Sequence, residues 1–414
     1  MIPTMPKPER MCNDPRLRPN SLTRACIRRR WLGVLLLSCV LLVAAPARAQ
    51  EAWLVTYGPG AEVWELFGHN ALWLRDPATG LDHTYSFGYF EIDRPGFHLD
   101  FARGIMLYYG ASSPAAREFE FYRSRQRSIS VQRLNLAPDQ VRHLHQLLHA
   151  AIFPHPQYYP YDYFRNNCST WLRDLIDQVL DGRLEPQLKA QPARLNFRDH
   201  TRRMTYPRPW IHTGIMLLMG SSIDASISAW EESFLPDALA RWLDTVVIDD
   251  EPLVLESRVL HDPGVFRPPE EARGPWRLML AVGLLGAVLT LAPGMRPRNR
   301  WSRLPWHTGV LLAGTAGSLL LLMWLATGHH DTWNNWMVLL LNPFWWLLWR
   351  QWRKPFHAVL LLGLLAPMLL GALILAWPGL IQDRADQLAL VLPPLLAILV
   401  VAWRDGRGAD PARA

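Results

Sequence analysis

The pattern of hydrophobic and polar positions changes character at about residue 275. Before that point, short segments alternate apolar and polar residues as strands do, or repeat apolar residues at helical spacing. After it, apolar runs recur that approach the roughly 20 residues a helix needs to cross a bilayer. These runs cover residues 276–293, 307–326, 334–349, 357–377 and 388–403. The third run is short and is interrupted by Asn342-Pro343.

The first part of the chain predicts a mixture of strands and helices. Strands are indicated by "EAWLVTYGPG", "HNALWLRD", "HTYSFGYFEI" and "RSISVQRLNL". Two amphipathic helices follow, one in "APDQVRHLHQLLHAAI" and one after Cys168. The apolar face of the first contains Leu144, Leu147, Leu148 and Ile152, and that of the second contains Leu172, Leu175, Ile176, Val179 and Leu180. We expect an α+β domain in which an antiparallel sheet packs on helices.

The beginning of the chain has the composition of a secretory signal peptide. "RRRWLGVLLLSCVLLVAAPARAQ" joins basic residues to an apolar run and a small-residue site at Ala47-Arg48-Ala49. "LLSC" at Cys39 is similar to a lipoprotein cleavage box, but the apolar run continues past it, which favours the later cut. The predicted organisation is a signal peptide at 1–49, a domain at 50–262, a linker at 263–275, a five-span membrane domain at 276–404 and a tail at 405–414.

The charge distribution predicts which side of the membrane each part occupies. The formal net charge is +7, and the predicted export of the main domain argues against nucleic acid as a partner. Basic residues gather after spans one, three and five, whereas Arg384 is the only one in the other two loops. Because positive loops stay in the cytoplasm, residues 50–275 are expected outside. The basic residues are Arg296, Arg298, Arg300, Arg303, Arg350, Arg353, Lys354, Arg404, Arg407 and Arg413.

Cysteine usage singles out one thiol. Of the four cysteines, Cys12, Cys26 and Cys39 lie in the predicted leader, which leaves Cys168 alone in the exported protein. A lone thiol there is either an inert core residue or a nucleophile. Cys168 follows Asn167, a favoured N-cap residue, at the start of a predicted helix. The helix N-terminus favours a thiolate, and its free amides offer a site for an oxyanion.

A nucleophilic thiol needs a base. The three histidines in "HLHQLLH" look like a solvated helix face, and His83 lies beside a turn. His69 differs, because it follows Gly68 and opens a strand. A glycine there lets a neighbouring backbone or a substrate approach closely. His69 is therefore the preferred base, although a lone histidine is more often simply a polar residue of the core or surface.

The segments "FGHNALWLRD", "YSFGYF", "YPYDYFRNNCSTWLRDLID" and "SFLPDAL" resemble the periplasmic domain of Lnb-type lipoprotein N-acyltransferases. The resemblance covers most of residues 50–245 and implies a papain-like fold in permuted, NlpC-type order, with Cys168 as nucleophile and His69 as base. The third residue stays open, because Ser86 stands where relatives have asparagine. The remaining candidates for orienting His69 or binding an oxyanion are Asp82, His83 and Asn167.

The resemblance also implies the reaction. A membrane-bound, cysteine-dependent enzyme would move an acyl chain from a phospholipid to the N-terminal amine of lipoproteins through a thioester, without metal or cofactor. Its place would be the bacterial inner membrane, with the N-terminal domain in the periplasm. Two alternatives remain open: a membrane-tethered thiol peptidase or amidase acting on cell-wall peptides, and a non-enzymatic receptor or assembly factor in which Cys168 is buried.

Two further features are expected near the membrane surface. The loop "TGHHDTWNNW" falls on the outer side, where His329, His330 and Asn335 are candidates for contact with a substrate headgroup. Simple anchoring by its tryptophans is the alternative. The aromatic segments "FGYFEIDRPGF" and "GIMLYYG" either reach toward headgroups or form core strands.

Overall fold

The structure is a computed structural model, and it describes residues 50–155, 157–271, 274–294, 303–350, 354–376 and 384–407. The predicted signal peptide at 1–49 lies outside the described residues. So do half of the basic residues used to orient the membrane part, namely Arg296, Arg298, Arg300, Arg353 and Arg413. The described residues of 51–75 and those from 82 onward belong to one compact unit. The turn Asp76–Leu81 and Gln50 belong to a second, smaller unit. Within it, the Gln50 side chain donates a hydrogen bond to Asp76.

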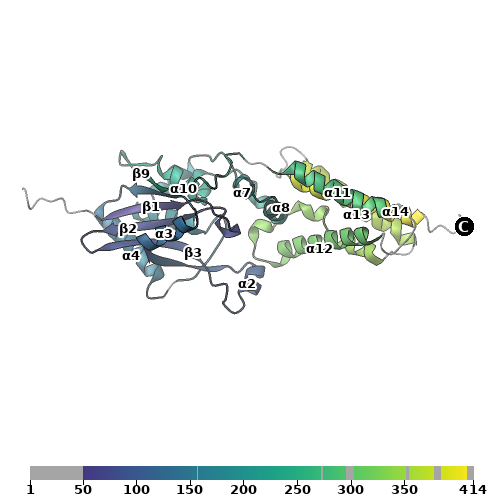
Figure 1. Cartoon of the computed structure of the whole chain (residues 1–414), viewed down its shortest axis with the longest axis horizontal. Helices are drawn as coiled ribbons and strands as arrows, with labels where there is room; N and C mark the ends of the chain where they lie inside the picture. Colours follow the sequence, from purple (N-terminus) through teal and green to yellow (C-terminus); the bar gives the residue numbers. More distant parts are fainter. Residues whose placement is uncertain are drawn as a thin grey trace, which may run out of the picture. The chain divides into compact units, whose positions relative to one another are not determined.

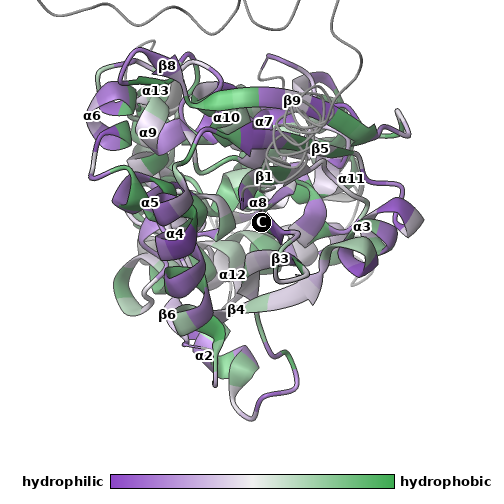
Figure 2. Cartoon of the chain, turned by 90° about the vertical axis from the view of Figure 1, so that its left-hand side faces the viewer, coloured by the Kyte–Doolittle hydropathy of each residue, from purple (hydrophilic) through white to green (hydrophobic). Residues whose placement is uncertain are grey.

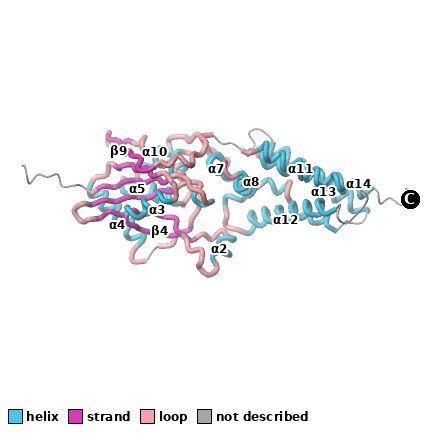
Figure 3. Tube along the Cα trace, viewed as in Figure 1, coloured by secondary structure: helices cyan, strands magenta, loops and turns pink. Residues whose placement is uncertain are grey.

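A seven-stranded sheet forms the centre of the first part, in the order β6-β4-β3-β2-β1-β5-β9 (Figures 1 and 3). The pairs β1–β2, β1–β5, β3–β4, β4–β6 and β5–β9 are antiparallel, as the alternation of residues in the sequence predicted. The strands are β1 (Glu51–Tyr57), β2 (His69–Asp76), β3 (Leu81–Tyr89), β4 (Leu107–Pro114), β5 (Ile129–Leu134), β6 (Tyr159–Pro160) and β9 (Val254–His261). Strands β6 and β9 were not predicted, whereas β4 contains part of "GIMLYYG", for which a core strand was one of the two alternatives.

Strand β1 is buried on both faces, which explains its nearly continuous apolar sequence. On one face Val55 and Tyr57 pack with Phe119 and Tyr122 of α3 (Ala115–Ser124). Strand β1 also contacts α4 (Pro138–Ile152) and α10 (Pro236–Leu243), and α5 (Cys168–Val179) packs on both of these helices. The α+β domain with an antiparallel sheet packed on helices is confirmed.

The two amphipathic helices are confirmed as well. In α5 every residue of the predicted apolar face is buried. In α4 Leu144, Leu148 and Ile152 are buried, and Val141 joins them. Shorter elements complete the domain: η2 (Val63–Glu65), α2 (Phe97–Arg103), α6 (Leu184–Lys189), α7 (Phe197–Thr205), α8 (Pro209–Leu218), η3 (Ser221–Ile223), α9 (Ala229–Glu232), β7 (Val247–Ile248) and β8 (Glu251–Pro252).

The C-terminal part is helical among the described residues (Figure 3). Its helices are α11 (Trp276–Gly294), α12 (Leu304–Ala326), α13 (Lys354–Ala376) and α14 (Ala385–Arg407). They coincide with the first, second, fourth and fifth predicted spans. Two stretches, Leu304–Ala326 and Ala385–Asp405, are long and apolar enough to cross a membrane. The apolar parts of α11 and α13 are shorter.

The third predicted span does not form one continuous helix. Residues 334–350 instead contain two 3-10 segments, η6 (Trp336–Leu339) and η7 (Pro343–Arg350), and the chain breaks between them at Asn342. Proline lacks the N–H that would continue a helix, and the Asn342 side chain accepts a hydrogen bond from the Phe344 N–H instead. An ideal Cβ on Gly317 of α12 would lie 2.4 Å from the Asn342 backbone. Glycine thus lets α12 lie directly against the break, as expected of small residues in membrane helices.

Helix α8 is an apolar element that the sequence analysis did not predict. It has the sequence "PWIHTGIMLL" and joins the C-terminal helices rather than the sheet. Leu217 and Leu218 at its end pack on the core of those helices. His212, which is fully buried, lies 2.8 Å from Asp386 of α14. Helix α8 therefore ties the first part of the chain to the helical part.

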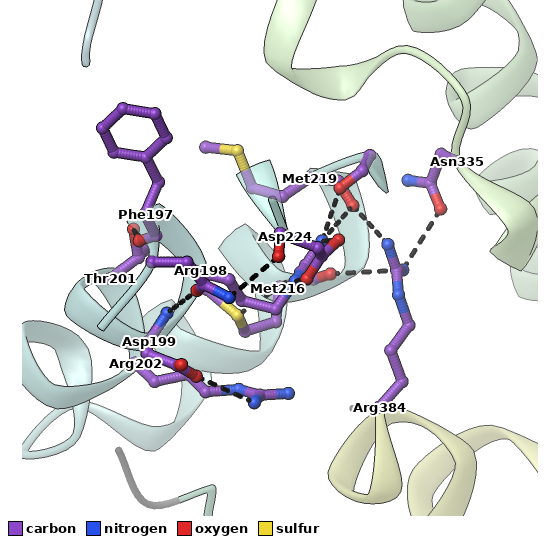
Figure 4. Close-up of polar contacts among 12 residues, drawn as sticks. Phe197, Arg198, Asp199, Thr201, Arg202, Met216, Met219, Asp224, Asn335 and Arg384 are labelled. Carbon is purple, nitrogen blue, oxygen red and sulfur yellow. Dashed lines mark hydrogen bonds and ion pairs between the residues drawn. The ribbon is translucent and has the colours of Figure 1, made fainter. Parts of the chain in front are cut away.

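A buried polar cluster closes the end of α8 (Figure 4). Arg384 donates hydrogen bonds to the Met219 carbonyl and to Asn335, and Arg198 pairs with Asp224 while also reaching the Met219 carbonyl. The last carbonyls of a helix have no partner within it, and basic side chains satisfy them well. Both arginines are fully buried. Arg384, the one basic residue in the predicted outer loops, therefore caps the C-terminal end of α8.

Replacing Gly317 by leucine should destabilise the helical part, because the new side chain would collide with the Asn342 backbone. Overpacking of this kind costs about 1–3 kcal/mol. Gly363→Leu is the matched control, because no described heavy atom lies within 4 Å of an added Cβ on that residue of α13. Thermal unfolding in detergent should show a lower midpoint for Gly317→Leu alone. Equal midpoints for the two variants would contradict the close packing of α12 on the break.

Candidate active site

Cys168 is the first residue of α5, as the sequence predicted. The Asn167 side chain caps the helix by accepting hydrogen bonds from the Ser169 N–H at 2.9 Å and the Thr170 N–H at 3.0 Å. Its amide group donates to the carbonyls of Tyr163 and Phe234. Every polar atom of this side chain is engaged, so Asn167 holds the helix start in place and is not available as an oxyanion donor.

The Asn167 cap leaves fewer free amides at the start of α5 than the sequence analysis expected. The Ser169 and Thr170 amides are already bonded to Asn167, because a buried cap satisfies the first donors of its helix. Among the first three amides of α5, that of Cys168 is the one the Asn167 side chain does not engage. An oxyanion at this thiol would therefore depend on that one helix amide, not on a set of unpaired ones.

Asn70 connects the start of α5 to the start of β2. Its Oδ1 accepts a hydrogen bond from the Ser169 hydroxyl at 2.8 Å, and its Nδ2 donates to the Val55 carbonyl and the Thr56 hydroxyl. The Asn70 backbone amide also acts to lower the pKa of the Cys168 thiol. Because Asn70 directly follows His69, these bonds bring the thiol to the strand residue next to the predicted base. The sequence analysis did not identify Asn70.

His69 is half-buried at the edge of the aromatic core. It faces Tyr57 in the β1–β2 register, and its ring stacks with those of Tyr57 and Tyr122 at centroid distances of 6.2 and 6.4 Å. Gly68 has a φ of +84°, and an added Cβ would lie 2.8 Å from the Tyr57 carbonyl oxygen. Glycine is thus required before His69 for close backbone approach, as predicted. Stacking, rather than a carboxylate, orients the imidazole.

Burial favours the neutral forms of both groups. It lowers the pKa of His69 to about 3, and the nearby Arg127 guanidinium acts in the same direction. Burial also raises the pKa of the Cys168 thiol, against the opposing effect of the hydrogen bonds from Asn70 and Ser169. Cys168 has 8% of its surface exposed. The site therefore rests as a thiol and a neutral imidazole, and the resting ion pair is disfavoured.

Arg127 is a charged residue of this site that the sequence analysis missed. It is buried, donates a hydrogen bond to the Gly58 carbonyl and lies 3.6 Å from the Glu65 carboxylate. Its guanidinium carbon lies 4.7 Å from the centre of the Tyr122 ring. The Arg127 guanidinium thus lies over the Tyr122 ring, which also stacks on His69. Its positive charge near the imidazole disfavours protonation of His69.

Ser86 lies in a buried network that centres on Glu118. Its hydroxyl donates to Glu118 Oε1 at 3.2 Å, and the Tyr57 hydroxyl donates to the same oxygen at 2.9 Å. Thr84 donates to the other carboxylate oxygen. Burial raises the pKa of the Glu118 carboxyl. Ser86 thus helps to hold Glu118 and Tyr57, and it contributes to the position of His69 only through the Tyr57 ring.

Asp82 and His83 lie at the opposite end of the β2–β3 hairpin from His69. Asp82 accepts a hydrogen bond from Trp73 Nε1 at 2.7 Å, and His83 Nδ1 lies 3.2 Å from the Ser112 hydroxyl. At about 3.3 Å per residue, the length of β2 separates them from His69 by roughly 20 Å. The structure therefore does not bring Asp82 or His83 to the imidazole, because β2 separates its two ends by its full length.

The loop after α12 contacts the segment that precedes Cys168. Asp331 is buried and forms an ion pair of 2.7 Å with Arg165, which closely precedes Cys168 in sequence. His329 Nε2 donates to the Phe101 carbonyl of α2. Asn335 donates to the last turn of α8, and the His330 and Trp333 rings meet edge to face. The hydrogen bonds of His329 and Asn335 thus connect the loop after α12 to α2 and α8 of the first part of the chain.

Comparison with known proteins found a family match for the first part of the chain. Residues 44–204 match a family model described as the Lnb N-terminal periplasmic domain. The resemblance inferred from the sequence is thereby confirmed over a range that contains both His69 and Cys168. No curated protein and no solved structure matches the chain significantly. The periplasmic domain family and the two apolar helices together suggest a membrane protein that processes lipoproteins.

The low pKa of His69 predicts a specific acid sensitivity. Between the ordinary histidine value of 6.5 and about 3, the unfolded chain takes up a proton at this position and the folded protein does not. The free energy of unfolding should therefore fall as the pH drops through this window. His69→Gln should flatten that fall in thermal melts recorded in detergent, whereas His143→Gln on the exposed side of α4 should not. Equal slopes for wild type and His69→Gln would contradict the neutral imidazole.

Proposed function

We propose that this protein is a membrane-bound, cysteine-dependent acyltransferase that moves an acyl chain from a phospholipid to the N-terminal amine of lipoproteins. The observation that carries the proposal is the contact between the capped helix start at Cys168 and the strand start at His69, made through Asn70. It occurs in a domain whose family is named for its periplasmic location. The anchoring of this domain to apolar helices supports lipid substrates over soluble ones.

Part of this proposal is a papain-like fold in permuted, NlpC-type order. In such enzymes a thiol at a helix start meets an imidazole on the sheet, and permutation places histidine before cysteine in the chain. Here His69 opens β2 and Cys168 opens α5, which fits that order. The third member of the usual triad has no counterpart among the predicted residues. Stacking on Tyr57 and Tyr122 takes over the orientation of the imidazole in this proposal.

A second part is a five-crossing topology in the bacterial inner membrane, with the N-terminal domain in the periplasm. Helices α11, α12, α13 and α14 supply four crossings, of which two meet the length criterion. The η6–η7 segment supplies the fifth. A 3-10 helix rises about 2.0 Å per residue, so 334–350 extends over roughly 30 Å, which is about the thickness of the hydrocarbon core. Irregular backbone at that depth requires cover by protein, which α12 provides at Gly317.

The first half-reaction transfers the acyl group to sulfur. A phospholipid ester carbonyl binds beside Cys168, and His69 accepts the thiol proton as the sulfur attacks the carbonyl carbon. The negative charge on the tetrahedral oxygen is stabilised by the Cys168 amide. The bond from carbon to the glycerol oxygen then breaks, and His69 returns its proton to that oxygen. A lysophospholipid leaves, and a thioester remains.

The second half-reaction delivers the acyl group to nitrogen. The N-terminal amine of a lipoprotein attacks the thioester carbonyl and loses a proton to His69. The carbon–sulfur bond breaks, and the sulfur recovers a proton from the imidazole, which restores the resting pair. Because both substrates are held in the same bilayer, a thiol fixed at its surface gains a large effective concentration of each. The ion pair between Arg165 and Asp331 keeps the helix start beside the membrane part.

The proposal predicts that the purified full chain N-acylates a diacylated lipopeptide when it is reconstituted with phosphatidylethanolamine. Mass spectrometry should detect a transient mass gain of one acyl group on the Cys168 peptide and a lysophospholipid product. Cys168→Ala should abolish both products. His69→Ala should reduce them about 100-fold or more, because general-base catalysis contributes 10² to 10⁴. Ser124→Ala, on the exposed end of α3, is the matched control and should leave them unchanged.

The opposite outcome is equally clear. Release of peptides from purified murein without lipid, combined with no acyl adduct on Cys168, would replace the acyltransferase by a thiol peptidase. Neither activity, with Cys168→Ala fully functional in cells, would show that the thiol is only a buried core residue.

A further inference from the structure

A continuous row of aromatic side chains runs from the thiol to the membrane part. Successive ring centroids lie 4.2 Å apart from Tyr161 to Tyr108, 5.1 Å from Tyr108 to Phe90, 5.6 Å from Phe90 to Phe97 and 6.1 Å from Phe97 to Phe101. These five residues come from four separate segments of the chain, so local sequence spacing does not explain the row. We name it the aromatic track.

The track begins at Cys168. An ideal Cβ on Gly88 would lie 3.7 Å from the Cys168 Cβ and 4.0 Å from the Tyr161 ring. Gly88 has a φ of +107°, which L side chains rarely adopt. The glycine therefore leaves the space between the thiol and Tyr161 without a side chain. Tyr161 and the next three members are only half-buried, so the row keeps an accessible surface.

The track ends at the outer boundary of the membrane part. Phe101 lies 5.8 Å from the ring of His329 and offers its carbonyl to that ring. The neighbouring Arg103 carbonyl accepts a hydrogen bond from the Gly328 N–H. Gly328 follows α12, which ends at Ala326 and is one of the two helices long enough to cross a membrane. Helix α2 is thus fixed beside the outer end of a membrane-spanning helix.

The surface around α2 exposes several large apolar side chains among charged ones. No residue of α2 is buried, and Leu99 is 56% exposed and Phe101 40%. Figure 2 shows hydrophobic residues on α2, in contrast to the hydrophilic surface of α4. Exposed apolar groups that continue from a membrane-spanning helix fit a lipid surface. Further exposed apolar residues in the flanking segments are Ile92, Ile105 and Leu107.

We propose that the aromatic track is the binding path for the acyl chain of a phospholipid, which enters from the outer leaflet at α2 and reaches Cys168 past Gly88. This inference rests on the proposed function and names how its lipid substrate is held. Aromatic rings give an acyl chain apolar contact without a fixed length requirement, and each methylene group removed from water adds about fourfold in affinity. The sequence analysis left open whether these aromatic segments form core strands or reach toward lipid. They do both: Tyr108 belongs to β4, and α2 reaches the membrane part.

The experiment uses the full chain with Cys168→Ala, so that binding is observed without the reaction. It is reconstituted in nanodiscs of phosphatidylethanolamine and phosphatidylglycerol that contain a phosphatidylethanolamine with a photoreactive diazirine in one acyl chain. After illumination, cross-linked peptides are mapped by mass spectrometry. We expect cross-links in residues 87–108 and 158–165 as well as in the apolar helices.

Variants separate the track from general lipid contact. The double variant Phe90→Asp with Phe97→Asp should lose cross-links in residues 158–165 at least tenfold, while those in α12 stay unchanged. Phe90→Leu with Phe97→Leu should retain them, which shows that apolar character rather than folding is measured. Phe121→Asp, half-exposed on α3, is the matched control and should retain them.

Cross-links confined to α11, α12, α13 and α14, or equal yields in the aspartate variant and the control, would overturn the path. These results are independent of catalysis. If cross-links follow the track but no acyl adduct forms on wild-type Cys168, the acyltransferase fails and the lipid path stands. If the adduct forms but cross-links avoid the track, only the path is wrong.

Discussion

The candidate site depends on the hydrogen bonds that Asn70 makes between the start of β2 and the start of α5. They join two elements about a hundred residues apart in sequence. Strand β2 begins with His69, and helix α5 begins with Cys168. The Asn70 side chain is completely buried, and every bond it makes replaces one with water that burial has removed. Loss of any partner would leave an unsatisfied polar group in the core, so the strand start and the helix start can occupy only this relative position.

A second constraint fixes the thiol to the membrane part. The loop after α12 reaches back to Arg165 through Asp331 and to α2 through His329, while Arg384 closes the end of α8. These contacts use buried charges and backbone groups, which tolerate little displacement. The proposed chemistry and the proposed lipid path therefore share one requirement. The thiol has to stay at a fixed position relative to the outer end of α12, because both substrates arrive from the bilayer.

Sequence reasoning succeeded where local pattern determines structure, and it was incomplete where distant segments meet. The strands at 51–57 and 69–76, the N-cap at Asn167 and the apolar face of α5 each follow from short-range periodicity and capping chemistry. Asn70 gave no signal, because an asparagine in a strand is indistinguishable from a surface residue until its partners are known. Helix α8 was missed because its apolar run is too short to span a bilayer. The break at Asn342-Pro343 was visible, but its consequence depended on the glycines of α12.

The central claim is that Cys168 is a nucleophile served by His69, despite a sulfur that is mostly buried and a thiol whose pKa is raised. The rate of Cys168 alkylation by iodoacetamide as a function of pH tests it most directly, in wild type and in His69→Ala. If His69 removes the proton, the variant should react at least about tenfold more slowly at pH 7 and equally fast at pH values above the thiol pKa. Identical profiles for the two proteins would show that the imidazole does not act on the thiol and would contradict the account.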